Sequence, residues 1–340
     1  MSRKKIFDAA YLGDLCLKNR LIRSATWEAL CDESGAVGDE LCEMYCELAR
    51  GGVGAIITSL TSVTDDDHCL EGILRLSKDE LMESHKKLVD LVHEEGGIIL
   101  TQIVLGEYHR NEEDRNLAID DLTMEDLERV KTLFVNTAIR AEKAGYDGIQ
   151  LHAAHGFFLS RFISPTYNHR SDCYGGSAEH RGRLLFEILK EIGKQCPKLH
   201  LCMKINSSDF REGGLTPEDS LIICKMCEEA GVHSIEVSGT GTCRTQIKAG
   251  INEAYFKEYA IDFAAELGIP VILVGGNRSI ENMEAVLNEG NVEFLSLSRP
   301  LIREPNLPNR WFSGETEPAK CISCNKCYDT HGHVCIFNVK

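Results

Sequence analysis

The chain has 340 residues, of which 53 are acidic and 37 are basic, so its formal net charge is −16. Because no polybasic block interrupts this acidity, the composition argues against binding of nucleic acid or of an anionic membrane surface. No stretch has the apolar core of a signal peptide or the length of a membrane span, so we interpret the chain as a cytoplasmic protein that acts on a small molecule. The helical faces carry no pattern that predicts an oligomeric state.

Fifteen cysteines are present, yet a large chain without an export signal is expected to keep its thiols reduced. Most of them stand singly in apolar or helical contexts and are predicted to be small buried residues, among them Cys16, Cys31, Cys202 and Cys224. A cluster near the C-terminus is the exception.

One unit recurs along the chain: an amphipathic helix, a glycine and a short apolar run. Glycine after a helix permits the left-handed turn, and near-continuous apolar runs are typical of a parallel sheet buried on both faces. The expected helices span 41–50, 81–95, 124–144, 182–195, 217–230, 254–267 and 280–289, and the expected strands span 21–24, 55–59, 98–104, 148–151, 200–206, 234–238, 271–274 and 294–297.

Eight such strands alternating with helices predict a closed (β/α)8 TIM barrel, an α/β fold. We expect one domain over residues 1–312, followed by a short cysteine-rich extension over 313–340. The alternative is an open doubly wound sheet. It is weakened because no Gly-x-Gly-x-x-Gly motif follows the first strand.

Barrel chemistry lies where the strands end, so the residues after each apolar run are the candidate site. The turn Gly275-Gly276-Asn277 precedes a helix with a predicted cap at Ser279, and Ser298-Arg299 follows the last strand. Backbone amides and a guanidinium there predict a phosphate site. An ordinary glycine turn beside a surface arginine remains the alternative.

Lys204 ends a strand whose other residues are apolar, so it needs an anion or strong acceptors. A flavin N1–C2=O edge would supply them, and so would a structural ion pair with Glu236. A Schiff-base lysine of a non-redox barrel enzyme is a further alternative.

His152 and His155 straddle the end of a strand, and no glutamate follows the first as in the zinc-protease motif. Two neutral donors to a carbonyl oxygen are therefore favoured over metal ligands. A pair of structural histidines stays open.

Several motifs occur together and in order, and they resemble those of the Old Yellow Enzyme family of FMN-dependent ene-reductases over almost the whole barrel. They are Asn19-Arg20 with Ser24-Ala25-Thr26, Gln102, Ala144-Gly145-Tyr146-Asp147-Gly148, His152-Ala153-Ala154-His155-Gly156, Asn168-x-Arg170-x-Asp172-x-Tyr174-Gly175-Gly176-Ser177, Glu179-x-Arg181-x-Arg183 and Arg299-Pro300.

The resemblance implies an NAD(P)H:flavin oxidoreductase that passes hydride through FMN to an α,β-unsaturated carbonyl or related alkene, with His152 and His155 binding the carbonyl oxygen. The chain carries Ser298 where the family usually has glycine. The implied FMN contacts are Ser24, Ala25, Thr26, Ser59, Gln102, Lys204, Gly275, Gly276, Asn277, Ser298 and Arg299.

The chain departs from the family at Phe157, where the usual proton donor is a tyrosine. Phenylalanine has no proton to give. Tyr108, His109, Tyr167 or solvent could take its place, and the sequence does not choose among them.

Cys321, Cys324, Cys327 and Cys335 suit a [4Fe-4S] cluster and resemble the cluster segment of 2,4-dienoyl-CoA reductase and trimethylamine dehydrogenase. Those relatives have a longer gap before the last cysteine. Zinc and no metal are the alternatives. With Phe157, this segment also motivates a second hypothesis, a flavin protein that transfers electrons or senses redox state without ene-reductase turnover.

Overall fold

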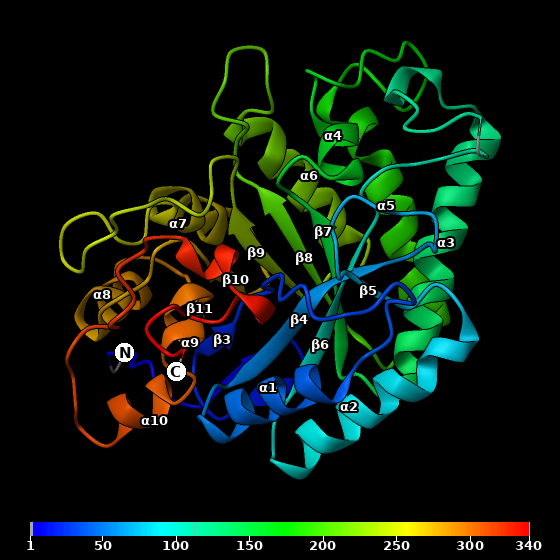
Figure 1. Cartoon of the computed structure of the whole chain (residues 1–340). Helices are drawn as coiled ribbons and strands as arrows, with labels where there is room; N and C mark the ends of the chain where they lie inside the picture. The colour runs from blue at the N-terminus through cyan, green and yellow to red at the C-terminus, as the bar shows by residue number, and fades with distance from the viewer. Residues whose placement is uncertain (1–2, 112, 340) are drawn as a thin grey trace.

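The computed structural model describes residues 3–111 and 113–339, and its centre is a closed barrel of parallel strands (Figure 1). Closure follows from the pairing of the first barrel strand with both the second and the last. The predicted (β/α)8 fold is therefore confirmed. The barrel strands are β3 (Leu21–Arg23), β4 (Ala55–Ser62), β6 (Ile99–Val104), β7 (Gly148–Ala153), β8 (His200–Asn206), β9 (Ser234–Ser238), β10 (Val271–Leu273) and β11 (Phe294–Leu297).

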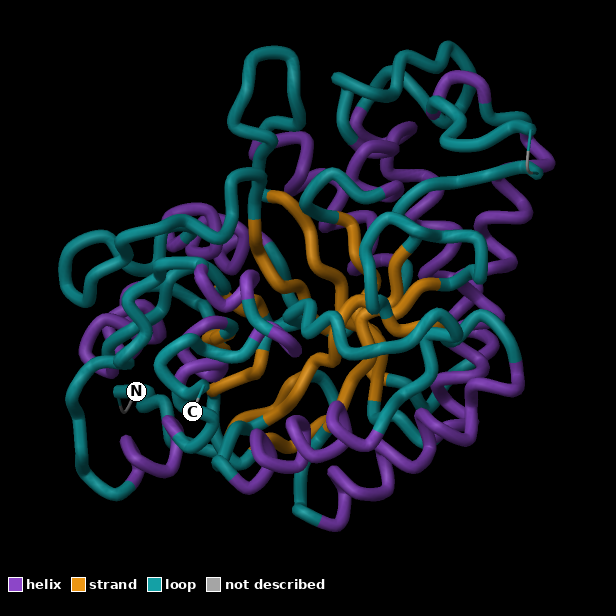
Figure 2. Tube along the Cα trace, in the orientation of Figure 1, coloured by secondary structure: helices purple, strands orange, loops and turns teal. Residues whose placement is uncertain are grey.

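Helices surround the strands on the outside, as Figure 2 shows by colour. Thr123, Ser177, Thr216 and Ser279 each cap a helix by accepting a backbone N–H, which confirms the predicted cap at Ser279. The main helices are α1 (Asp39–Arg50), α2 (Met82–Glu94), α3 (Met124–Ala144), α5 (Ala178–Gln195), α6 (Pro217–Glu229), α7 (Lys257–Glu266) and α8 (Ile280–Glu289).

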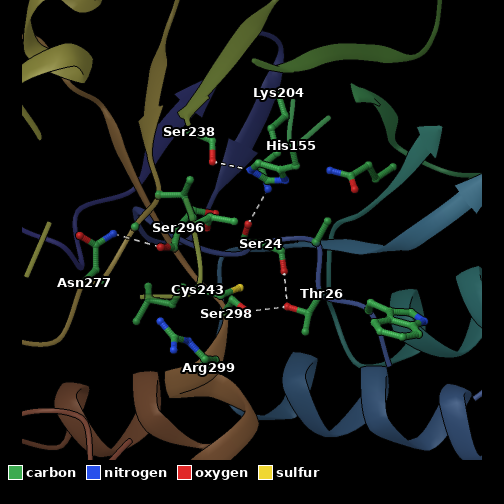
Figure 3. A pocket seen from close by; sticks show the side chains of 18 of the residues that line it. Ser24, Thr26, His155, Lys204, Ser238, Cys243, Asn277, Ser296, Ser298 and Arg299 are labelled. Carbon is green, nitrogen blue, oxygen red and sulfur yellow. Dashed lines mark hydrogen bonds between the residues drawn. The ribbon is translucent and has the colours of Figure 1, made fainter. Parts of the chain in front are cut away.

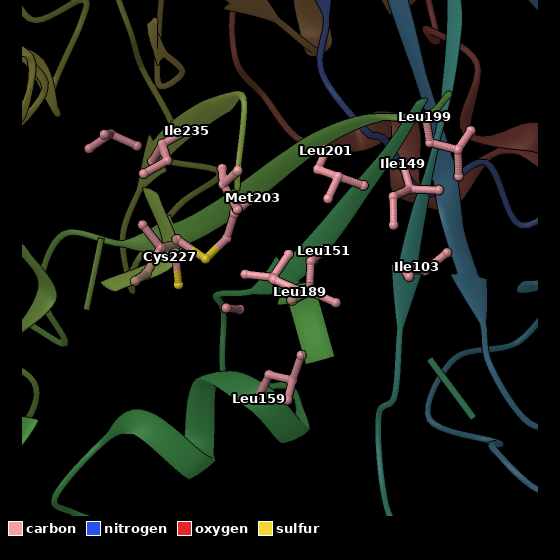
Figure 4. Close-up of a cluster of buried hydrophobic side chains, with 14 of the residues drawn as sticks. Ile103, Ile149, Leu151, Leu159, Leu189, Leu199, Leu201, Met203, Cys227 and Ile235 are labelled. Atoms are coloured by element: carbon pink, nitrogen blue, oxygen red, sulfur yellow. The ribbon is translucent and has the colours of Figure 1, made fainter. Parts of the chain in front are cut away.

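The strands bury both faces, which explains why they read as continuous apolar runs. Side chains such as Leu151, Leu201 and Met203 point outward and pack with Leu189 of α5 and Cys227 of α6 (Figure 4). The apolar layer between strands and helices fixes the barrel, and it leaves the inward-facing positions to the site.

A hairpin that the sequence analysis missed closes the amino end of the barrel. Strands β1 (Ala10–Leu12) and β2 (Leu15–Leu17) pair antiparallel, and Leu12 and Leu17 pack with the first inward residues of the barrel strands, such as Ile22. The chemistry is thereby left to the opposite, carboxyl end. Cys16 lies on this hairpin and is exposed, so its predicted burial was wrong, whereas Cys202 and Cys224 are buried.

Short elements lie at the carboxyl end of the strands: β5 (Leu74–Arg75), α4 (Phe158–Ile163) and α9 (Arg299–Arg303), with single 3-10 turns at Asp79–Leu81 and Ile119–Asp121. The short helix α10 (Leu307–Phe312) packs instead near the amino end, where the backbone N–H of Asn309 donates to the backbone oxygen of Gly51. These segments are too short for a period-based prediction from sequence.

The last segment, residues 313–339, forms a tail with two 3-10 turns, Lys326–Asp329 and His331–His333. In Figure 1 this red segment crosses the barrel beside α9. Asn325 donates to the backbone oxygen of Cys243 at 2.8 Å, and His333 hydrogen-bonds the backbone oxygen of Trp27 at 2.7 Å.

Among the described helices, none is long and apolar enough to cross a membrane.

Candidate active site

A pocket opens at the carboxyl end of the barrel strands, where the sequence analysis placed the chemistry (Figure 3). Almost every predicted site residue of the barrel lines it. Its wall is formed by Ser24, Ala25, Thr26, Trp27, Leu60, Leu70, Gln102, His152, His155, Phe157, Lys204, Ser238, Thr242, Cys243, Tyr255, Val274, Gly275, Gly276, Asn277, Arg278, Ser296, Leu297, Ser298, Arg299, Pro300 and Tyr328.

Lys204 is anchored at the pocket floor by two oxygen atoms. Its Nζ lies 3.1 Å from Oε2 of Glu236 and donates to Oγ of Ser24 at 3.0 Å. Glu236 is fully buried and does not line the pocket. The two alternatives for Lys204 are thus compatible, because the lysine is ion-paired below and faces the pocket above.

A backbone cradle lies at the other end of the pocket. Gly275 and Gly276 have φ values of 116° and 88°, and a Cβ atom at either would lie within 2.9 Å of an aromatic carbon of Tyr255 or Phe256. Only glycine fits there. Oγ of Ser296 is buried and has no hydrogen-bond partner among the described residues, so a ligand atom is free to bind it.

Two arginines border this cradle, and both are held by the tail. Arg299 donates to Oδ1 of Asn325, and Arg278 donates to Oγ of Ser323 at 2.6 Å. Arg278 was not singled out in the sequence, although it directly follows the Gly-Gly-Asn turn. The neighbouring arginines make this end of the pocket suitable for an anion.

The N-terminus of α8 is already occupied by a carboxylate. Oε2 of Glu253 accepts the backbone N–H groups of Arg278 and Ser279, at 2.8 and 2.9 Å. Glu253 therefore binds the helix start that the sequence analysis expected to contact phosphate. The glycine turn and the arginine side chains remain as the groups that could bind an anion in the pocket.

His152 and His155 stand together where β7 ends, with ring centroids 5.1 Å apart. His155 adopts a left-handed φ of 62°, its backbone N–H donates to Oδ1 of Asn206 at 3.1 Å, and its Nε2 lies 2.8 Å from Oγ of Ser238. Such backbone strain in a non-glycine residue is typical of functional sites. Nδ1 of His152 is buried without a hydrogen-bond partner among the described residues.

Both histidines are neutral at physiological pH. Burial lowers the pKa of His155 to about 3, with a further contribution from the positive charge of Lys204. Burial also holds the pKa of His152 well below its ordinary value, helped by His155 and Lys204. A neutral imidazole still carries one N–H, so each ring can donate a hydrogen bond without carrying charge.

Phe157 packs against the ring of His152, with centroids 4.9 Å apart. None of the three side chains named from the sequence as substitute donors lines this pocket. The Tyr108 hydroxyl donates to Asp126 at 2.9 Å, His109 lies in a separate hollow, and the ring of Tyr167 is covered by the guanidinium of Arg211. The tyrosines on the pocket wall are Tyr255 and Tyr328.

The structure places Ser59 behind the pocket wall. Its backbone N–H donates to the hydroxyl of Tyr45 at 2.7 Å, and Leu60 takes the lining position. The sequence analysis missed Cys243 and Tyr328, whose Sγ and Oη atoms are 3.3 Å apart. Only the tail's return to the barrel brings Tyr328 here, and no local sequence signal announces that return.

The four tail cysteines surround one small hollow next to Arg299. Nη atoms of Arg278 and Arg303 lie 3.9 Å from Sγ of Cys321 and 4.0 Å from Sγ of Cys335, respectively. Within residues 3–111 and 113–339, no three potential ligands converge closely enough to hold a single metal ion. The four cysteines that line the hollow are Cys321, Cys324, Cys327 and Cys335.

These features define a class: a (β/α)8-barrel protein with an anion cradle, a buried lysine and a neutral histidine pair in one pocket. Over residues 5–317 the chain matches the model of the NADH:flavin oxidoreductase / NADH oxidase family, and it belongs to that family. The predicted resemblance is thereby confirmed. A Schiff-base barrel enzyme finds no support in this match.

Known proteins support the same placement. The chain is 33% identical to an NADH oxidase of Thermoanaerobacter brockii over 94% of its own length and 52% of that relative. A 2-naphthoyl-CoA reductase complex superposes with a TM-score of 0.84 at 25% identity, covering 96% of this chain and 54% of that one. An Old Yellow Enzyme homologue from Zymomonas mobilis superposes at 0.75 with 21% identity, over 94% and 99%, and shows the fold alone.

The chain spans about half the length of the first curated relatives it matches. What those longer proteins do as a whole therefore reaches this chain only as a proposal.

Proposed function

We propose that the protein is an FMN-dependent oxidoreductase that uses NAD(P)H to reduce an α,β-unsaturated carbonyl compound or a related alkene. One observation carries the proposal: two neutral histidines share a pocket with an anchored lysine and a glycine cradle flanked by arginines. The barrel, residues 1–312, would hold this site, and the extension over 313–340 would cover its edge.

FMN fits the residues present. Ser24, Gln102 and Lys204 offer polar groups for the ring, and Ala25 and Thr26 line the same side. Gly275, Gly276, Asn277, Ser298 and Arg299, with Ser296 and Arg278, would take the phosphate end. Bound FMN would supply the hydride-transfer chemistry that no protein side chain has.

The histidine pair is suited to bind the substrate's carbonyl oxygen. As an alkene conjugated to that carbonyl accepts hydride, negative charge develops on the oxygen, and preorganised N–H donors stabilise it. Nδ1 of His152 has no hydrogen-bond partner among the described residues, and Ser238 and Asn206 hold His155 in place. The 2-naphthoyl-CoA reductase acts, by its name, on a carbonyl compound, which supports this substrate class.

The tail cysteines would hold a [4Fe-4S] cluster. Four cysteines around one hollow supply the required thiolates, and the guanidinium groups near Cys321 and Cys335 offset their charge. Three closely spaced cysteines and a fourth after seven intervening residues favour the cluster over zinc, because four-cysteine zinc sites usually use two tight pairs.

One observation favours a second function, electron transfer without alkene turnover. Arg299 borders both the flavin pocket and the cysteine hollow, so the two proposed redox sites are immediate neighbours. Phe157 in place of an acid is consistent with that alternative.

The proposal is tested on protein purified without oxygen and loaded with FMN. Addition of NADH or NADPH should bleach the flavin absorption, with one equivalent of nicotinamide consumed per FMN. Absence of FMN binding, or a bound flavin that neither nicotinamide reduces, would refute the NAD(P)H-dependent function.

A further inference from the structure

A hydrogen-bonded chain runs beneath the pocket floor and joins two of its walls. Nε2 of Gln102 donates to Oε1 of Gln150 at 2.6 Å, and Nε2 of Gln150 donates to Oε2 of Glu236 at 2.8 Å. At the far end Oγ of Ser24 donates to Oε1 of Glu236 at 2.8 Å, and Lys204 binds both of these residues.

The two ends of this chain face the pocket, and its middle does not. Gln102, Ser24 and Lys204 line the pocket, whereas Gln150 and Glu236 are fully buried and lie outside its lining. Glu236 is thus the central group of the network, and it can act on a ligand only through the side chains that touch it.

The carboxylate of Glu236 fixes the donor and acceptor roles of the two glutamines in this hydrogen-bond network. A carboxylate only accepts, so Gln150 must turn its NH2 group toward Glu236 and its oxygen toward Gln102. Gln102 must then give its own NH2 group to Gln150. In the described part of the chain, no hydrogen bond engages Oε1 of Gln102, so this side chain offers the pocket a carbonyl oxygen.

Glu236 also offsets the charge of the lysine. At 3.1 Å, its carboxylate neutralises most of the field that Lys204 would otherwise project into the pocket. The floor therefore presents a hydrogen-bond acceptor at Gln102 and, at Lys204, a cation whose charge is largely offset. This arrangement suits an imide edge, in which an N–H stands beside a carbonyl, as in the pyrimidine ring of a flavin.

We infer that Glu236 is a positioning residue that sets both the amide orientation of Gln102 and the effective charge of Lys204, and thereby the affinity and reduction potential of the bound flavin. The inference rests on the proposed FMN site. Because reduction adds negative charge at the N1–C2=O edge, a buried carboxylate below Lys204 favours the oxidised flavin.

The first test is Glu236→Gln in FMN-loaded protein, equilibrated without oxygen against a reference dye. Removing the carboxylate leaves Lys204 uncompensated, so the reduced fraction should rise, with the equilibrium constant changing roughly tenfold or more. Asp126→Asn removes another buried, ion-paired carboxylate, one that lies outside the pocket lining, and should change nothing. An unchanged equilibrium in Glu236→Gln would overturn the inference.

A second experiment uses Lys204→Met, alone and together with Glu236→Gln, so that the double variant leaves no uncompensated charge. Lys204→Met alone leaves an uncompensated carboxylate and should shift the equilibrium toward oxidised flavin. Adding Glu236→Gln to it removes that charge and should bring the equilibrium back toward the wild-type value. If the double variant matches Lys204→Met, Glu236 does not act on the flavin.

Gln150→Leu separates the effect of Glu236 on the orientation of the Gln102 amide from its effect on the charge of Lys204. It breaks the amide chain but keeps both charges, so FMN affinity should fall roughly tenfold while the dye equilibrium stays near that of the wild type. Unchanged affinity would refute the orientation role. Wild-type protein that fails to bind or reduce FMN would instead refute the proposed function, so the two failures are distinguishable.

Discussion

The ring of Phe157 packs against the ring of His152 in the pocket lining, with centroids 4.9 Å apart. Both rings line the pocket, so a proton donor at residue 157 would act beside the histidines that we propose bind the carbonyl oxygen.

Phe157→Tyr should therefore raise the rate of enone reduction. The added hydroxyl supplies a general acid, which typically contributes roughly a hundredfold. The rate to measure is reoxidation of the reduced flavin by 2-cyclohexenone in a stopped-flow instrument. Phe162→Tyr, a buried phenylalanine outside the pocket lining, is the control for the substitution itself. Equal rates in Phe157→Tyr and wild type would show that proton transfer does not limit the reaction.

Gly276→Ala should weaken FMN binding. The new Cβ would lie 2.8 Å from the ring of Tyr255 in a backbone of φ 88°, so the cradle must shift, and we expect roughly tenfold lower affinity. Quenching of FMN fluorescence measures this, and riboflavin, which lacks the phosphate, should lose less. Gly231→Ala carries similar backbone strain, with φ 98° and open space around the added atom, and should bind FMN normally.

Stability should fall as the pH drops below 6.5. Burial lowers the pKa of His85 to about 4 and that of His200 to about 3. Between the unfolded pKa near 6.5 and these values, only the unfolded state binds the proton. Each histidine therefore costs about 1.4 kcal/mol of stability per pH unit. Urea midpoints at several pH values measure the slope, which should be shallower in His85→Leu; an unchanged slope would contradict the neutral assignment.

The cysteine hollow should hold iron and sulfide in protein purified without oxygen. Cys324→Ser or Cys327→Ser should abolish both, whereas Cys16→Ser, on the exposed hairpin, should leave them intact. Iron and sulfide analysis with visible absorption makes the measurement. One zinc ion per chain without sulfide would refute the cluster.

The barrel was predictable because its signals are local and repeated. Apolar strands recur in every unit, glycines such as Gly145 end several helices, and caps such as Ser279 begin several, and the observed strands lie close to the predicted ones. The hairpin at Ala10–Leu17 was missed because its strands are only three residues long.

The site was predictable only where its residues stand at strand ends. His152, Lys204 and Gly276 are found this way. Glu253 at the start of α8 and Tyr328 at the pocket wall arrive from distant loops, and only tertiary contacts place them. The amide orientation beneath the floor likewise depends on cross-strand contacts that no spacing in the sequence predicts.

The central claim, that this pocket reduces an activated alkene with hydride held by FMN, is tested most directly by reoxidation of the reduced protein. FMN-loaded protein is reduced with one equivalent of NADH or NADPH, freed of nicotinamide, and mixed without oxygen with 2-cyclohexenone. We predict return of the oxidised flavin spectrum with one equivalent of cyclohexanone formed, and loss of this reaction in His152→Ala with His155→Ala. A flavin that stays reduced in the wild-type protein would contradict the claim.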